Sequence, residues 1–163
     1  MAAPKGNPND HPVAEFEHGL TGTCLCGSVR VTIHDKELFT RRRGHLCHCS
    51  NCRKAAGSIL AANLLIEADK VEIQDTAGTL KTYHDHDTLS GNPVLRFFCG
   101  VDGNPIKSES HLSPGKVILK LGIFPRIPEP EMESFVTHKH PWEADLTGVI
   151  KYKLTRGGET VEE

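Results

Sequence analysis

Six cysteines, gathered at three places, constrain this chain more than any other feature of its sequence. Two groups are dense, at residues 24–27 (CLCG) and 47–52 (CHCSNC), and Cys99 stands alone. The N-terminal stretch 1–12 holds no apolar run that would mark a secretory signal, so we expect a reducing, cytoplasmic setting in which disulfides are rare. Closely spaced thiolates in such a chain indicate metal ligands.

The first group predicts a structural zinc site that needs help from elsewhere in the chain. Cys24 and Cys26 supply two thiolates, and Cys99, at the end of an apolar run, is the third candidate. Asp102 stands three residues later, and zinc accepts carboxylate oxygen at about 2.0–2.2 Å. A Cys3Asp site is one interpretation; the other is that Asp102 only marks a turn before Gly103.

The second group predicts a zinc site with an open position. Cys47, Cys49 and Cys52 place three thiolates within six residues, and every other cysteine belongs to the first site. Three protein ligands with a vacant fourth position are typical of catalytic zinc. Alternatively, His48 or a distant histidine closes the site, although a residue between two ligands is expected to point away from their metal. The distant candidates are His45, His111, His138 and His140.

Two residues beside this cluster are candidates for catalysis. His48 is the histidine nearest in sequence to act as general acid or base. Arg53, followed by Lys54, would offset the negative charge of a Zn(Cys)3 unit and orient a substrate carboxylate. The plainer interpretation is that both cations lie on a solvated helix face.

Composition excludes two broad classes of partner. The formal net charge is −2, without the basic excess of a nucleic-acid binder except at residues 41–43 (RRR). No stretch approaches the roughly 20 apolar residues that span a membrane. We therefore expect a small-molecule substrate, no nucleic acid and no membrane, while the oligomeric state stays open.

Short β-branched runs between turn signals predict an all-β, single domain at residues 19–155. Flexible tails are expected at residues 1–18 and 156–163. One short helix is expected at residues 51–56, after the second cysteine group. The predicted strands lie at residues 28–33, 59–66, 70–73, 80–83, 94–98, 116–121 and 134–137.

Three motifs in order resemble the glutathione-dependent formaldehyde-activating enzymes and the related centromere protein V. They lie at residues 22–29 (GTCLCGSV), 47–58 (CHCSNCRKAAGS) and 97–103 (FFCGVDG), where Asp102 stands in place of the usual cysteine. The resemblance implies a β-tent of stacked antiparallel sheets, a structural zinc held by the first and third motifs, and a labile zinc at the second. It also implies addition of glutathione to formaldehyde, formally a carbon–sulfur lyase reaction in reverse, although relatives serve other pathways, including secondary metabolism.

Three functions follow as hypotheses. The leading one is a lyase-type enzyme with two zinc ions and glutathione as a possible co-substrate, which forms or cleaves carbon–sulfur bonds, dehydrates or decarboxylates. The second is a non-catalytic, zinc-stabilised binding module. The third is a redox or metal-storage thiol protein.

Overall fold

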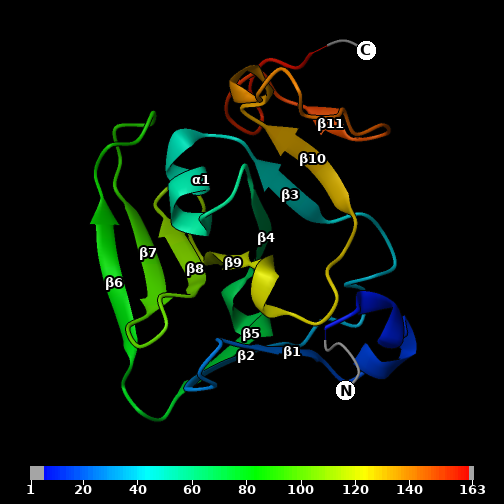
Figure 1. Cartoon of the computed structure of the whole chain (residues 1–163), viewed down its shortest axis with the longest axis vertical. Coiled ribbons are helices and arrows are strands. Elements are labelled where there is room, and N and C mark those ends of the chain that lie inside the picture. Colours follow the sequence, from blue (N-terminus) through cyan, green and yellow to red (C-terminus); the bar gives the residue numbers. More distant parts are fainter. Residues whose placement is uncertain (1–5, 162–163) are drawn as a thin grey trace.

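The computed structural model describes residues 6–161, which form two β-sheets and one short α-helix (Figure 1). The three-stranded sheet has the order β1-β2-β5, with β1 Leu20–Thr23, β2 Val29–Ile33 and β5 Val71–Asp75. The eight-stranded sheet has the order β11-β10-β3-β4-β9-β8-β7-β6. Its strands are β3 Gly44–Cys47, β4 Ala61–Glu67, β6 Leu80–Asp85, β7 Val94–Cys99, β8 Pro105–Ser110, β9 Lys116–Lys120, β10 Pro130–Ser134 and β11 Ile150–Lys151.

The helix α1 spans Ser50–Ala56 and lies over the eight-stranded sheet, beside the ends of β3 and β6 (Figure 1). Gly57 ends it with a left-handed conformation, φ 61°, which a glycine adopts at little cost. The short 3-10 helices are η1 Pro8–Asp10, η2 Val13–Phe16, η3 Ala68–Lys70, η4 Leu121–Ile123 and η5 Val136–His138. Within residues 6–161, no helix has the length and hydropathy needed to cross a membrane.

The apolar core lies between the two sheets. Alternate residues of β2 face inward, so that Val29, Val31 and Ile33 are fully buried. Leu64 and Ile66 of β4 bury the same way from the larger sheet. The core also contains Leu20, Leu38, Ile106, Val117, Leu119, Leu121 and Phe124. One face of the eight-stranded sheet thus packs on the core, and α1 with the cysteines at its start lies on the other face.

The all-β prediction is confirmed, with one difference in strand direction. Most neighbouring strands are antiparallel, as expected, but β10 runs parallel to both β3 and β11. The predicted strand at 134–137 is wrong beyond its first residue, because Phe135 adopts φ 58° and turns the chain into η5. The predicted helix at 51–56 matches α1 to within one residue.

Both predicted tails make contacts where the structure describes them; residues 1–5 and 162–163 lie outside the described residues. Near the N-terminus, Phe16 packs on Phe39 with ring centroids 5.6 Å apart, and Arg126 donates hydrogen bonds to the backbone oxygens of Pro8 and His11. Near the C-terminus, the amide of Val161 bonds back to β11. Contacts to the rest of the protein therefore also occur on either side of residues 19–155.

Candidate metal centres and the adjoining cavity

The structure brings the first predicted ligand set together as a four-donor cluster of Cys24, Cys26, Cys99 and Asp102. One donor atom from each residue lies within 4.8 Å of the others. The sulfur of Cys26 is 3.5 Å from that of Cys24 and 3.6 Å from that of Cys99. A tetrahedral zinc with Zn–S bonds of about 2.3 Å would separate its sulfur ligands by about 3.8 Å. The three thiols therefore fit one zinc ion after small shifts.

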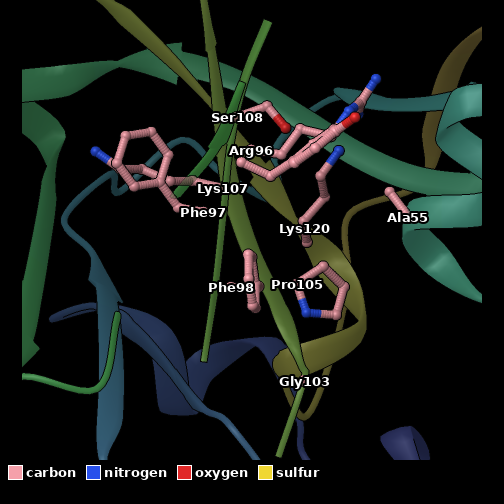
Figure 2. A pocket seen from close by; sticks show the side chains of 10 residues that line it. Ala55, Arg96, Phe97, Phe98, Gly103, Pro105, Lys107, Ser108 and Lys120 are labelled. Atoms are coloured by element: carbon pink, nitrogen blue, oxygen red, sulfur yellow. The ribbon is translucent and has the colours of Figure 1, made fainter. Parts of the chain in front are cut away.

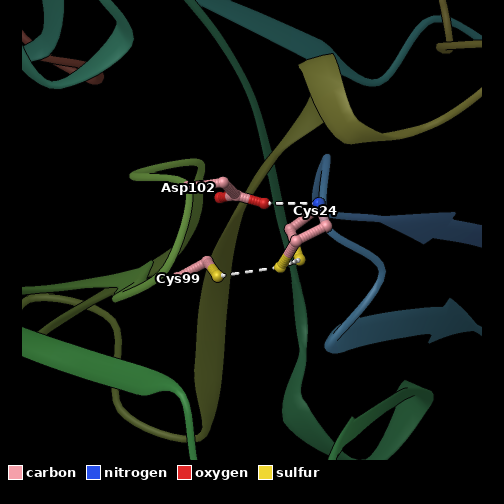
Figure 3. A group of neighbouring side chains, drawn as sticks. Cys24, Cys99 and Asp102 are labelled. Carbon is pink, nitrogen blue, oxygen red and sulfur yellow. Dashed lines mark hydrogen bonds between the residues drawn. The ribbon is translucent and has the colours of Figure 1, made fainter.

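Asp102 faces the first cysteine loop across the cluster (Figure 3). Its Oδ2 accepts a hydrogen bond of 2.7 Å from the amide of Cys26, and its Oδ1 accepts one of 2.8 Å from the amide of Asn104. These amides hold the pKa of Asp102 well below its usual range, so the group is a carboxylate. Each oxygen keeps a second lone pair, and Asp102 can thus both bind the Cys26 loop and offer a metal ligand.

A hydroxyl that the sequence analysis did not identify also faces this cluster. Ser28 Oγ lies 3.0 Å, 3.5 Å and 3.7 Å from the sulfurs of Cys26, Cys99 and Cys24. It also lies 2.9 Å from Thr79 Oγ1, ahead of β6. Although burial opposes the shift, hydrogen bonds from Ser28 and from nearby backbone amides lower the pKa of Cys99 to about 7. The cluster is therefore supported by hydrogen bonds to its sulfurs.

The second predicted set forms a three-donor cluster of Cys47, Cys49 and Cys52. Cys47 ends β3, Cys49 is the N-cap of α1, and Cys52 lies in its first turn. The Cys49 sulfur accepts a hydrogen bond of 3.4 Å from the Cys52 amide. The three sulfurs lie within 4.8 Å of one another, and within residues 6–161 no histidine or carboxylate joins the group. The strand-to-helix turn thus gathers three soft donors that suit zinc.

A chain of charged contacts holds this cluster against strands β6 and β7. The Arg96 guanidinium bonds to the Asp85 carboxylate, with Nε 2.7 Å and Nη2 2.6 Å from Oδ2, and its positive charge helps to lower the pKa of Cys52. Asn51, at the start of α1, donates to both carboxylate oxygens of Asp85 at 3.1 Å and 3.0 Å. Such contacts around a metal ligand orient it and tune its charge.

The charges of the three thiols depend on one another. Hydrogen bonds from Cys47 and Cys49 lower the pKa of Cys52 to about 2, and the cations Lys120 and Arg96 act in the same direction. The pKa of Cys47 is raised, chiefly because its hydrogen bonds to Cys49 and Cys52 favour the thiol form. The two cations therefore favour the thiolate form of Cys52.

His48 points away from the three sulfurs into the protein and has no exposed surface. Its Nε2 is 3.0 Å from Glu133 Oε1 on β10, and its Nδ1 is 3.2 Å from Glu143 Oε2, at an angle that makes no hydrogen bond. The Lys139 ammonium lies 3.8 Å from Glu133. In this arrangement the ring links the cysteine turn to β10 and to the segment after it, and it does not reach solvent.

Arg53 of α1 contacts the segment that follows β10. Its Nη1 is 2.9 Å from Nε2 of His140, and its buried Nε has no hydrogen-bond partner within residues 6–161. The His140 ring stacks on Trp142, with centroids 5.3 Å apart and planes within 5°. Trp142 is 69% exposed. The predicted histidine candidates thus differ in their surroundings. His140 contacts Arg53, whereas His111 and His138 are exposed.

A cavity of about 200 Å³ lies between α1 and strands β7–β9 (Figure 2). Ala55 of α1, one turn after Cys52, forms part of its wall, and Phe98 and Pro105 contribute apolar surface. The remaining lining residues are Tyr83, Arg96, Phe97, Gly103, Lys107, Ser108 and Lys120. Because Arg96 and Lys120 both line the cavity and interact with Cys52, the cavity adjoins the three-donor cluster.

Strand register explains why polar groups gather there. Tyr83 lies opposite Arg96, and Arg96 opposite Ser108, in antiparallel pairs whose facing side chains share one face of the sheet. Lys120 lies opposite Asn63 on the next pair of strands. The sequence analysis missed these residues; one signal was present, because Lys120 is the charged residue in the interior of the predicted strand 116–121, where it follows three apolar residues.

Comparisons with known proteins agree with this geometry. The family model described as "Glutathione-dependent formaldehyde-activating enzyme" matches residues 19–138. No curated protein matches significantly. A crystal structure of a Rhodobacter sphaeroides protein aligns at 20% identity and a TM-score of 0.49 over 64% of this chain and 86% of that one, a likeness too weak to carry an argument. Because the family model matches residues 19–138, most of the chain, this chain belongs to the glutathione-dependent formaldehyde-activating enzyme family.

Proposed function

We propose that this protein is a zinc-dependent, lyase-type enzyme that acts on a carbonyl compound or a thiol adduct at the three-donor cluster. The observation that supports it most is the pairing of three converging thiols with a cavity. When bound there, zinc would supply Lewis acidity, polarising a carbonyl or lowering the pKa of a thiol or water. The four-donor cluster would hold a second, structural zinc.

The reaction types that fit are carbon–sulfur bond formation or cleavage, dehydration and decarboxylation. The family description makes glutathione a candidate co-substrate. At about 200 Å³ the cavity is smaller than the roughly 300–1,000 Å³ of pockets for drug-sized ligands. A small aldehyde would fit inside, whereas the tripeptide would keep most of its length outside. Six free cysteines favour a reducing, cytoplasmic location.

Two predicted catalytic residues take supporting roles in this proposal. His48 is fully buried between carboxylates, so we assign it the positioning of Cys47 and Cys49 rather than direct proton transfer. Arg53 does not line the cavity and has no carboxylate within bonding distance among the described residues. We propose that it offsets the negative charge of the metal-loaded cluster and holds His140.

The alternative, a non-catalytic binding module, is distinguished by metal content and turnover together. Zinc is measured by elemental analysis on wild type and Cys49→Ser, before and after mild chelation. Adduct formation is followed by NMR for thiol–aldehyde pairs, starting with glutathione and formaldehyde. We expect two zinc ions in wild type, one of them lost on chelation, and a single retained zinc and no turnover in Cys49→Ser.

Cys26→Ser is the matched control, because it makes the same sulfur-to-oxygen change in the other cluster. It should disturb the retained zinc and leave the labile one. If Cys49→Ser kept both zinc ions and full turnover, the open-zinc proposal would be wrong, and the binding module would become the better explanation.

A further inference from the structure

The cavity beside the three-donor cluster is lined by two buried polar groups that can accept further hydrogen-bond partners. Ser108 is 1% exposed, and its Oγ has no hydrogen-bond partner within residues 6–161. Lys120 is 6% exposed, and among the same residues its Nζ bonds only to the amide oxygen of Asn63, at 2.7 Å. An ammonium carries three donors, so two of them remain available. Buried groups of this kind are costly to leave unpaired.

The other cations of the cavity differ from Lys120 in having carboxylate partners. Arg96 pairs with Asp85, and Lys107 pairs with Glu109 while its Nζ lies 4.4 Å above the ring centroid of Phe97. Figure 2 shows the Lys107 chain running along Phe97, away from the ends of Ser108 and Lys120. Lys120 is therefore the lining cation without a carboxylate partner, and no acid lines the cavity in the part of the chain described.

The free donors of Lys120 are suited to an anion. Its Nζ keeps two donors after the bond to Asn63, and no carboxylate pairs with it within residues 6–161. A carboxylate in the cavity would accept hydrogen bonds from these donors and from Ser108 Oγ.

We propose that this cavity recognises a small carboxylate-bearing carbonyl compound, whose carboxylate is bound by Lys120 Nζ and Ser108 Oγ. The inference rests on the proposed function for the carbonyl chemistry, and it narrows the substrate to an anion. Phe98 and Pro105 would contact the carbon skeleton, and the cavity volume of about 200 Å³ limits the ligand to a few carbons. Recognition would occur through fixed donors, with no covalent step.

The test compares an anion with its neutral isostere. Pyruvate and pyruvamide are titrated into the zinc-loaded protein, and dissociation constants are measured by NMR. We expect pyruvate to bind at least about tenfold more tightly than pyruvamide, as a charge-assisted contact predicts. Lys120→Met should remove this preference. Ser108→Ala removes a single hydroxyl group and so changes packing little; it should weaken pyruvate binding by about threefold to tenfold.

Lys107→Met is the matched control, because it removes the same charge from the same cavity at a group already paired. Its dissociation constant for pyruvate should stay within about twofold of wild type. Equal binding of pyruvate and pyruvamide by wild type, or equal losses in Lys107→Met and Lys120→Met, would overturn the proposal. Failure of the open-zinc function is recognised separately, by the zinc content and turnover of Cys49→Ser.

Discussion

The four-donor cluster joins the two sheets of the molecule, whereas the three-donor cluster lies on one face of a single sheet. Cys24 and Cys26 come from the loop between β1 and β2, and Cys99 and Asp102 from the end of β7 and the turn after it. The three-donor cluster is built within one strand-to-helix turn and borders a cavity. Cysteine thiols thus connect the two sheets at one cluster and border a cavity at the other.

Their surroundings differ in charge as well. Around the four-donor cluster the supporting groups are hydroxyls and backbone amides, such as Ser28 and the amide of Cys26. Around the three-donor cluster they are cations, Arg96 and Lys120. Hydrogen bonds from neutral groups thus stabilise the donors of one cluster, and positive charge lies beside the thiols of the other.

The largest expected effect comes from breaking the cluster that joins the sheets. Cys99→Ser removes a fully buried ligand, and we expect the melting temperature to fall by about 10 °C or more, since a structural zinc contributes directly to folding. Cys49→Ser should shift it by no more than about 3 °C. Thermal unfolding followed by circular dichroism checks both. Equal shifts would show that the two clusters do not divide their roles in this way.

The next effect concerns the fourth position of the same cluster. If Asp102 is a ligand, Asp102→Ala should weaken zinc binding there by about tenfold to a hundredfold. Asp102→Cys should bind zinc more tightly than wild type, because it adds a fourth thiolate. Competition with a chromophoric chelator measures both affinities.

Ser28→Ala is the comparison variant for Asp102→Ala. Ser28 Oγ also faces all three sulfurs. If Ser28→Ala lost as much zinc affinity as Asp102→Ala, the hydroxyl and the carboxylate would contribute equally to zinc binding. Wild-type affinity in Asp102→Ala would mean that Asp102 only binds the Cys26 amide and shapes the turn.

A smaller effect is expected from the contacts behind the open cluster. Arg96→Met removes the cation that links Asp85 to Cys52, and we expect about tenfold weaker zinc binding at the three-donor cluster alone. Arg30→Met, at an exposed position on β2, is the control and should leave both affinities unchanged. If Arg96→Met weakened both sites equally, its effect would be on folding rather than on the open cluster.

The smallest effect is a pH dependence remote from both clusters. Although burial opposes the shift, hydrogen bonds from Arg43, the Glu37 amide and Lys70 lower the pKa of Asp35 below its ordinary range. Its carboxylate therefore stabilises the fold above about pH 4, and this contribution is lost as the pH falls through the folded-state pKa. Asp35→Asn should reduce the free energy of unfolding by about 1–3 kcal/mol at pH 7.

Urea unfolding at pH 7 and at pH 3.5 checks this prediction, with zinc content measured in parallel. The difference between Asp35→Asn and wild type should shrink at the lower pH. A difference that is constant with pH would mean that the side chain contributes through packing rather than through its charge.

Local patterns were enough to predict the ligand sets, because short cysteine spacings depend little on how strands pair. The seven residues proposed as ligands form the two groups that the structure brings together, although metal binding itself remains a prediction. The cavity could not be predicted in this way. Arg96, Ser108 and Lys120 meet through the order and register of β7, β8 and β9, which are set by long-range packing.

The other differences from the sequence-based predictions have identifiable physical causes. The strand predicted at 134–137 fails because Phe135 takes a left-handed conformation that is rare for a bulky residue. The parallel pairing of β10 with β3 needs a long connection, and no sequence periodicity reports it. His48 was expected near the chemistry from its position between two cysteines, but Glu133 and Glu143, distant in sequence, decide where its ring lies.

The hairpin of β7 and β8 contributes to the four-donor cluster and to the cavity. Cys99 ends β7, and two residues of the hairpin line the cavity: Arg96, three residues before Cys99, and Ser108, on β8. A bulge between Phe97 and Phe98 sets its register between these two points. Evolution toward a new substrate therefore has little freedom to move this backbone without loosening the joint between the sheets. Changes of specificity in such a scaffold should accumulate as exchanges of side chains along the cavity wall, at positions such as Tyr83.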